Sequence, residues 1–185
     1  AAIDIANART FNGIAKFANP LTVAGDGPDG LGALRNTNPR FEQPDAFQSV
    51  ALSGNASAYA VKRFDIRNGT LDLADRTLTV NAAGAAFGLS NTAVTNAAPG
   101  GAIAVASGEL RLDAARLAGS ATNALSIAPG ASLLLTNNVV PSPWSLSLGG
   151  GARVTAWTGT MDTNANAFAG PATLSSGTAG ITAAA

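Results

Sequence analysis

The chain has neither cysteine nor histidine, and it carries few charged residues. Without those two residue types, disulfides, thiolate chemistry, zinc–imidazole sites and the usual catalytic base are excluded. Charged residues make up 12% of the 185 positions, against about 25% in average soluble domains. Such a surface is covered mainly by Ser, Thr, Asn, Gly and Ala, which favour side-chain ladders and tight turns over solvated helices.

An excess of charge of either sign is also missing, because eleven basic residues balance eleven acidic ones. No basic field attracts nucleic acid or an anionic membrane surface. No apolar stretch reaches the ~20 residues of a membrane span. No charged n-region with an apolar h-region opens the chain, so we expect the signal of an exported protein to lie outside this sequence. The alanine-rich ends resemble no domain cap, so we expect a piece of a longer or processed polypeptide.

What the sequence does contain is a short alternation of apolar and polar residues, interrupted by glycine and asparagine. Four segments share one plan, an apolar-x-apolar triplet, a glycine corner and a second apolar stretch: 64–73, 103–112, 125–135 and 146–154. The corner glycines are Gly69, Gly108, Gly130 and Gly151. Their spacing indicates a repeat unit of about 20 residues, with two units between the first pair, within the range of solenoid repeats.

Each corner has a physical reason, because a sharp turn between short strands needs a left-handed backbone angle that Gly or Asn adopts easily. In the strands, alternate residues share a face. We therefore expect inward positions at Ile66, Leu71 and Leu73, and outward positions at Arg67, Thr70 and Asp72. One coil buries too little to fold alone, whereas stacked coils form a continuous core. The sequence thus predicts an all-β, right-handed parallel β-helix with about 20 residues per coil.

The domain organisation follows the repeat. We interpret residues 1–185 as a single solenoid segment, with a less regular, loop-rich part over 1–60 and regular coils over 61–177. Prolines near 36–45 indicate a loop protruding from one coil, because proline is confined to the edges and turns of sheets.

Several segments together resemble a known family. The stretch 25–36, GDGPDGLGALRN, is similar to the Gly-rich motif of proteins that carry autotransporter-associated β-strand repeats. The segments 50–56, 63–67, 69–73, 78–80, 144–152 and 169–174 fit the same pattern, so the resemblance covers most of 25–177. It implies a right-handed β-helical passenger or large surface protein outside a bacterial cell.

Clustered charges raise an enzymatic alternative. Asp65, Asp72 and Asp75 lie near three arginines in sequence: Arg63, Arg67 and Arg76. Some parallel β-helices are polysaccharide lyases or hydrolases that use paired carboxylates, Ca²⁺ or a basic residue. The favoured interpretation is a charged ladder on the outer surface, on which Asp65 and Arg67 share a face.

Other patterns that could carry chemistry are incomplete. Asp26 and Asp29 supply too few oxygens for the six to eight ligands of Ca²⁺, so that segment is interpreted as a turn. The run 149–151 precedes no helix that would complete a phosphate loop. Ser and Thr are abundant, but Lys16 and Lys62 occur in no Ser-x-x-Lys pattern. No catalytic residue, metal site or cofactor is therefore predicted.

Aromatic side chains are candidates for stacking on sugars. Trp144 is in phase with Leu146 and Leu148, so we expect it in the core. Trp157 and Tyr59 are the two predicted ligand contacts.

The favoured function is a secreted or cell-surface bacterial structural protein without catalysis, acting as a stiff spacer, adhesive surface or filament subunit. Its expected partners are further copies stacked end to end, because solenoid ends expose unpaired backbone groups, and a surface polysaccharide or a host surface. Two alternatives stay open, a β-helical polysaccharide lyase or hydrolase and a carbohydrate-binding module on an antiparallel sandwich.

Overall fold

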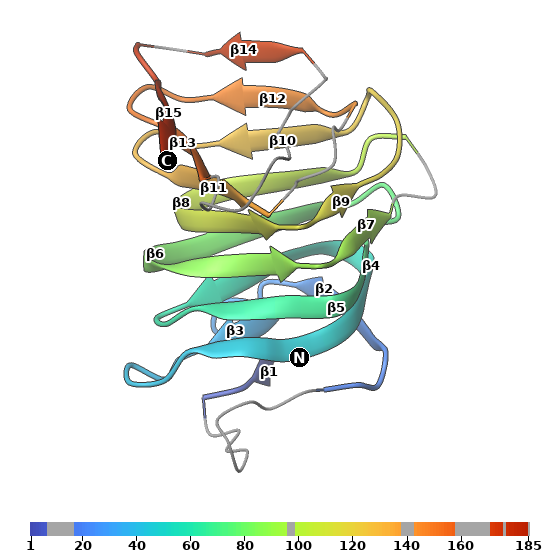
Figure 1. Cartoon of the computed structure of the whole chain (residues 1–185). Helices are drawn as coiled ribbons and strands as arrows, with labels where there is room; N and C mark the ends of the chain where they lie inside the picture. Colours follow the sequence, from blue (N-terminus) through green and yellow to red (C-terminus); the bar gives the residue numbers. More distant parts are fainter. Residues whose placement is uncertain (7–16, 96–98, 138–142, 158–170, 176, 185) are drawn as a thin grey trace.

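The computed structural model describes residues 1–6, 17–95, 99–137, 143–157, 171–175 and 177–184. All regular structure in those ranges is β-strand, and every strand pair is parallel. The chain forms a solenoid of about six turns with about 23 residues per coil. Figure 1 shows the rungs piled along one axis, from the blue N-terminal strands to the red C-terminal ones.

This architecture confirms the predicted parallel solenoid, and it excludes the antiparallel sandwich. The coil is somewhat longer than the predicted 20 residues. The right-handed winding stays a prediction.

The strand pairs fall into three faces, between which the chain turns at corners. Face 1 consists of these strands or parts of strands: β1 (Ile3–Asp4), β3 (Leu34–Asn36), the end of β4 (Gln43–Ala60), the starts of β6 (Thr77–Ser90) and β8 (Ala102–Asp113), β10 (Ala124–Ile127), β12 (Ser145–Leu148) and β14 (Ala172–Leu174).

Face 2 runs beside it around the same axis. It consists of the starts of β4 and β5 (Phe64–Asp72), the ends of β6 and β8, β11 (Ser132–Thr136), β13 (Arg153–Trp157) and β15 (Gly180–Ala184). Face 3 consists of β2 (Leu21–Gly25), the middle of β4, the end of β5, β7 (Ala93–Thr95) and β9 (Arg116–Leu117).

Register places equivalent apolar residues above one another, so the core is a set of columns. In face 2, Phe64 pairs with Phe87, and the column continues through Leu110 and Leu133, all fully buried. In face 1 a single column runs through every rung: Ile3, Leu34, Ala58, Val80, Val105, Ile127, Leu148 and Leu174.

The alternation predicted for the segment 64–73 is confirmed, because Ile66, Leu71 and Leu73 are fully buried. Their neighbours Arg67, Thr70 and Asp72 are half-buried or exposed.

An aromatic ladder stiffens the N-terminal half of the core. Ring centroids lie 5.6 Å apart for Phe17 and Phe47, 6.0 Å for Phe47 and Phe64, and 5.1 Å for Phe64 and Phe87. The last two pairs pack edge to face, the arrangement that aromatic quadrupoles favour.

The four corner glycines lie at two different corners. Gly108, Gly130 and Gly151 separate face 1 from face 2 and have φ of 75°, 75° and 77°. Gly69 separates face 2 from face 3, and there the left-handed residue is its neighbour Asn68, with φ 51°. Glycine is needed at position 69 for another reason: the main chain passes so close to Gln48 that an added Cβ would overlap the carbonyl of that residue. The stretch from Gly69 to Gly108 therefore spans less than two turns, which explains the short estimate of the coil.

At the corner between faces 2 and 3, residues with left-handed backbone angles recur at a regular spacing that the glycine positions do not indicate. Asn68, Asn91, Ala114 and Asn137 follow one another every 23 residues, with φ of 51°, 46°, 49° and 51°. The Nδ2 of Asn91 donates to the Oδ1 of Asn68 over 2.9 Å. Asparagine tolerates the left-handed region better than other residues with a Cβ, so this column fixes the corner on successive rungs.

The N-terminal part joins the same stack, and its predicted loop over 36–45 is confined to 37–42, because β3 ends at Asn36 and β4 begins at Gln43. The buried Asn36 fixes this loop. Its Nδ2 donates to the carbonyls of Phe41 and Lys62, both over 3.1 Å, and its Oδ1 accepts from the N–H of Asn38.

Candidate binding surfaces

The C-terminal rung presents apolar side chains that no described residue covers. Leu174 in β14 and Ile181 in β15 are 50% and 77% exposed. Their register partners one rung earlier, Leu148 and Val154, are buried. Within the described ranges β14 pairs only with β12, and β15 only with β13. The rung therefore offers both backbone hydrogen-bonding groups and an apolar surface.

A buried ion cluster lies on the outer side of face 2. Asp65 is 0% exposed although it points away from the core columns. Arg63 binds it in a bidentate way, with Nε to Oδ1 over 2.8 Å and Nη2 to Oδ2 over 2.6 Å. Arg67 adds a longer contact from Nη2 to Oδ2 over 3.4 Å, and its Nε donates to the carbonyl of Pro44 over 2.7 Å.

In this cluster, burial and the attraction between opposite charges shift the pKa values of Asp65 and Arg63 in opposite directions. Burial raises the pKa of the Asp65 carboxyl above its ordinary value, although hydrogen bonds and attraction from Arg63 and Arg67 act to lower it. Burial is also the largest influence on the pKa of Arg63 and acts to lower it, but the hydrogen bond to Asp65 and attraction from Asp65, Glu42 and Asp113 together raise that pKa above its ordinary value. Both carboxylate oxygens are occupied, so Asp65 acts as a structural anchor for two arginines.

A second polar cluster surrounds Asp113 at the end of β8. Ser90 donates to its Oδ2 over 2.7 Å, and Thr136 and Asn137 donate to its Oδ1 over 3.1 and 2.6 Å. Burial acts to raise the pKa of Asp113, but these three hydrogen bonds bring it below its ordinary value. The donors come from the rungs before and after β8, so the carboxylate ties three rungs together.

The carboxylates that could have formed a catalytic pair are kept apart. Asp65 lies on face 2 and Asp72 on face 3. The Oδ1 of Asp72 accepts from the N–H of Ala74 over 3.0 Å. Asp75 forms an ion pair with its neighbour Arg76 over 3.2 Å. Asp65 and Arg67 share a face, as predicted, but the expected solvent-exposed charged ladder is wrong at Asp65, which is fully buried. The carboxylates of Asp65 and Asp72 do not converge.

The Asp26–Gly30 segment forms a glycine turn. Asp29 accepts two bonds from Nη1 of Arg35, each 2.7 Å long, and one from the N–H of Leu31. The Arg35 guanidinium lowers the pKa of Asp29. Among the described residues, no three acidic side chains come together as metal ligands would, and no helix is long and apolar enough to cross a membrane.

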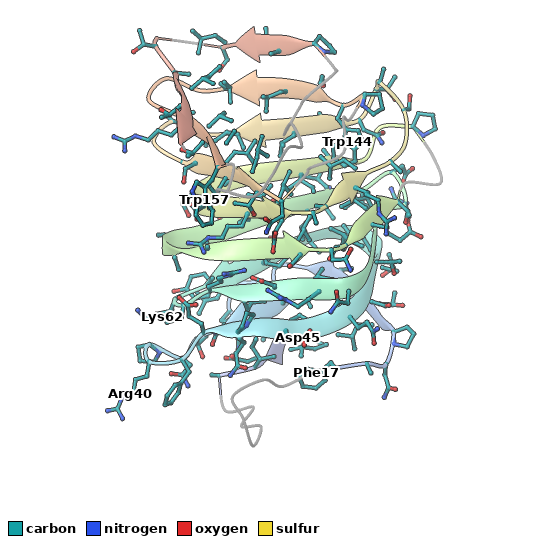
Figure 2. All side chains as sticks on the ribbon, viewed as in Figure 1. Phe17, Arg40, Asp45, Lys62, Trp144 and Trp157 are labelled. Atoms are coloured by element: carbon teal, nitrogen blue, oxygen red, sulfur yellow. The ribbon has the colours of Figure 1, made fainter. Side chains whose placement is uncertain are left out.

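The three aromatic candidates occupy different environments. Trp144 is fully buried, as expected, and its Nε1 donates to the carbonyl of Ala118 over 3.0 Å. Trp157 is 51% exposed at the end of β13 on face 2, and Figure 2 shows it far from Trp144 across the stack. Tyr59 lies outward on face 1, where the main chain of Gly32 packs closely against its Cβ. Trp157 thus offers a more open ring than Tyr59.

Comparison with known proteins gives no relative, since no family model, no curated protein and no solved structure matches the chain.

Sequence reasoning missed the asparagine corner column, the buried Asn36 and the Asp113 cluster. The asparagine column could be found by searching for identical residues at multiples of 23 positions, because Asn68, Asn91 and Asn137 fit that period. Asn36 and Asp113 carry no such local signal. Their roles depend on partners more than 20 residues away in the chain.

Proposed function

We propose that this chain is a non-catalytic structural solenoid, which acts at a bacterial cell surface as a stiff spacer and adhesive subunit and associates end to end. The observation that carries the proposal is the parallel register of all strand pairs among the described residues, which leaves Leu174 and Ile181 of the last described rung open to a further parallel rung. Low charge, lack of cysteine and the likeness of 25–177 to autotransporter-associated repeats support the extracellular location.

The partner of this rung is a second copy of the chain, stacked in the same direction. Within the described residues, the face 1 column runs from Ile3 to Leu174. Its continuation would place Ile3 of the next copy beside Leu174, with parallel hydrogen bonds as in every rung pair inside the molecule. A heterologous contact of this kind produces filaments where the rotation between copies does not close into a ring.

The enzymatic alternative finds less support in the geometry. Asp65 has both oxygens in ion pairs and no exposed surface, and Asp72 lies on another face. A general acid–base pair needs carboxylates that reach the substrate.

Sedimentation velocity and electron microscopy at rising protein concentration test the proposal. The chain should form rods that lengthen with concentration. Ile181→Lys and Leu174→Lys should keep it single, because each places a charge on the apolar rung. Ser126→Lys, on the outer side of face 1 in β10, is the matched control and should assemble normally. Particles that stay single at every concentration would contradict the proposal.

A further inference from the structure

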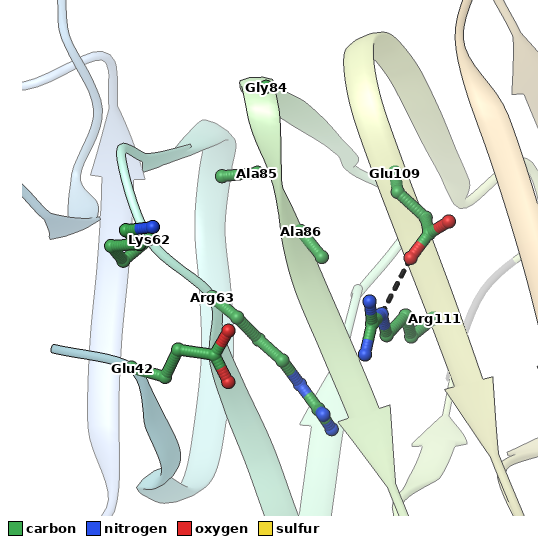
Figure 3. A pocket seen from close by; sticks show the side chains of 8 residues that line it. All are labelled: Glu42, Lys62, Arg63, Gly84, Ala85, Ala86, Glu109 and Arg111. Atoms are coloured by element: carbon green, nitrogen blue, oxygen red, sulfur yellow. Dashed lines mark hydrogen bonds and ion pairs between the residues drawn. The ribbon is translucent and has the colours of Figure 1, made fainter. Parts of the chain in front are cut away.

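A groove of about 220 Å³ crosses face 2 close to its corner with face 1. Figure 3 shows Glu42, Lys62 and Arg63 on one side of β6, and Glu109 with Arg111 on the other. Small residues of β6 form the part between them: Gly84, Ala85 and Ala86.

Register explains why the groove exists. Ala86 pairs with Glu109 on the following rung, and the Phe64–Phe87 pair aligns it with Arg63 on the preceding one. Rungs are about 4.8 Å apart, so a methyl group stands where a long side chain would fill the gap. The charged walls therefore lie roughly 10 Å apart across two rung spacings.

The walls are held in place by hydrogen bonds and ion pairs. Arg63 is fixed by its two bonds to Asp65. Asn36 ties the carbonyls of Phe41 and Lys62 together, which holds the segments next to Glu42 and Arg63. Arg111 is oriented by Glu109, with Nε to Oε1 over 2.6 Å. A preorganised site of this kind loses little entropy on binding.

Most of the polar side-chain atoms in the groove that these bonds do not use are hydrogen-bond donors. The bonds to Asp65 and Glu109 use Nε and Nη2 of Arg63 and Nε of Arg111. Nη1 of Arg63, both terminal nitrogens of Arg111 and Nζ of Lys62 make no further ion pair with the described carboxylates. Against them stand the carboxylate of Glu42 and one oxygen of Glu109.

We infer that this groove binds one carboxylate-bearing sugar unit of an acidic polysaccharide. The carboxylate pairs with the guanidinium of Arg111, and Lys62 on the opposite wall donates to a hydroxyl or ring oxygen of the same sugar, since guanidinium groups pair well with carboxylates. Glu42 and Glu109 accept sugar hydroxyls, and their negative charge disfavours multiply charged anions. The volume lies below the about 300–1,000 Å³ of drug-sized pockets, which suits a single ring. The inference deepens the adhesive role proposed above and rests on it.

Calorimetric titration of the whole chain with a galacturonic acid trimer tests the inference. Maltotriose is the neutral comparison, and sodium sulfate reports binding of an anion alone. The acidic trimer should bind in a saturable way, and maltotriose should not. Arg111→Gln and Lys62→Gln should each weaken binding about tenfold or more, as expected for a lost charge-assisted hydrogen bond. Arg153→Gln, an exposed arginine of face 2 outside the groove, is the matched control and should bind normally.

The inference is overturned if maltotriose binds as tightly as the galacturonic acid trimer, or if sulfate does. It is also overturned if Arg111→Gln and Lys62→Gln bind the acidic trimer as tightly as the wild-type chain. The Ile181→Lys protein separates it from end-to-end association, because it should bind the trimer normally while it stays single. If the wild-type chain binds the trimer but does not assemble, only the end-to-end association is contradicted. If it assembles but does not bind the trimer, only the sugar-binding inference is contradicted.

Discussion

The carboxylate of Asp65 lies against the main chain of Gly88, its register partner on the next rung. An added Cβ at position 88 would overlap that carboxylate. We predict that Gly88→Ala lowers the free energy of unfolding by about 1–3 kcal/mol, because a tightly packed group must move. Urea unfolding measures this change. Gly180→Ala is the control, since a Cβ there meets nothing within 4 Å. Equal midpoints for wild type and Gly88→Ala would show that Asp65 is not packed in this way.

The corner column predicts a stabilising substitution at Ala114, its member without an asparagine side chain. Left-handed backbone costs roughly 1 kcal/mol for an ordinary residue with a Cβ, and asparagine relieves part of that cost. Ala114→Asn should raise the free energy of unfolding by about 0.5–1 kcal/mol, measured by urea unfolding. The reverse change, Asn91→Ala, should lower stability, because it also removes the 2.9 Å bond to Asn68. A neutral or destabilising Ala114→Asn argues against the corner geometry.

The two tryptophans should respond differently to the same substitution. Trp144→Phe removes buried ring volume and the 3.0 Å bond to the Ala118 carbonyl, and should cost about 1–3 kcal/mol. Trp157→Phe, on a ring that is half exposed, should cost less than Trp144→Phe. Fluorescence of the Trp157→Phe protein should be blue-shifted and resistant to acrylamide, because only Trp144 then emits. Strong quenching of that protein would contradict burial of Trp144.

The Asp113 cluster predicts loss of stability in acid. The folded-state pKa of Asp113 lies below its ordinary value of 3.8. The Asp113 carboxylate therefore contributes fully to the free energy of unfolding above pH 3.8, and this contribution is lost as the pH falls through the lower folded-state pKa. Asp113→Asn should lower stability at neutral pH and flatten the decline below about pH 4. Carboxyl NMR titration measures the pKa directly, and Ser90→Ala, which removes one donor, should raise it. A wild-type value at or above 3.8 would refute this prediction.

The fold was predictable because its main signal is local. Alternation around Ile66 and Leu71 identifies the strands, and the glycine and asparagine turns identify the corners. The coil length was less accessible, since Gly69 and Gly108 look alike in sequence but lie at different corners. The groove could not be predicted, because Arg63, Ala86 and Arg111 meet only through register between rungs.

Cross-linking between copies tests the end-to-end account most directly. Continuation of the face 1 column would bring Asp4 of one copy beside Ser175 of the previous one, at a rung spacing that permits a disulfide. Two proteins, Asp4→Cys and Ser175→Cys, are mixed and oxidised in the absence of any other cysteine. The account predicts a disulfide between the two different variants, prevented by adding Ile181→Lys to the Ser175→Cys protein. Cross-links formed only between identical variants, or none at concentrations where rods form, would contradict it.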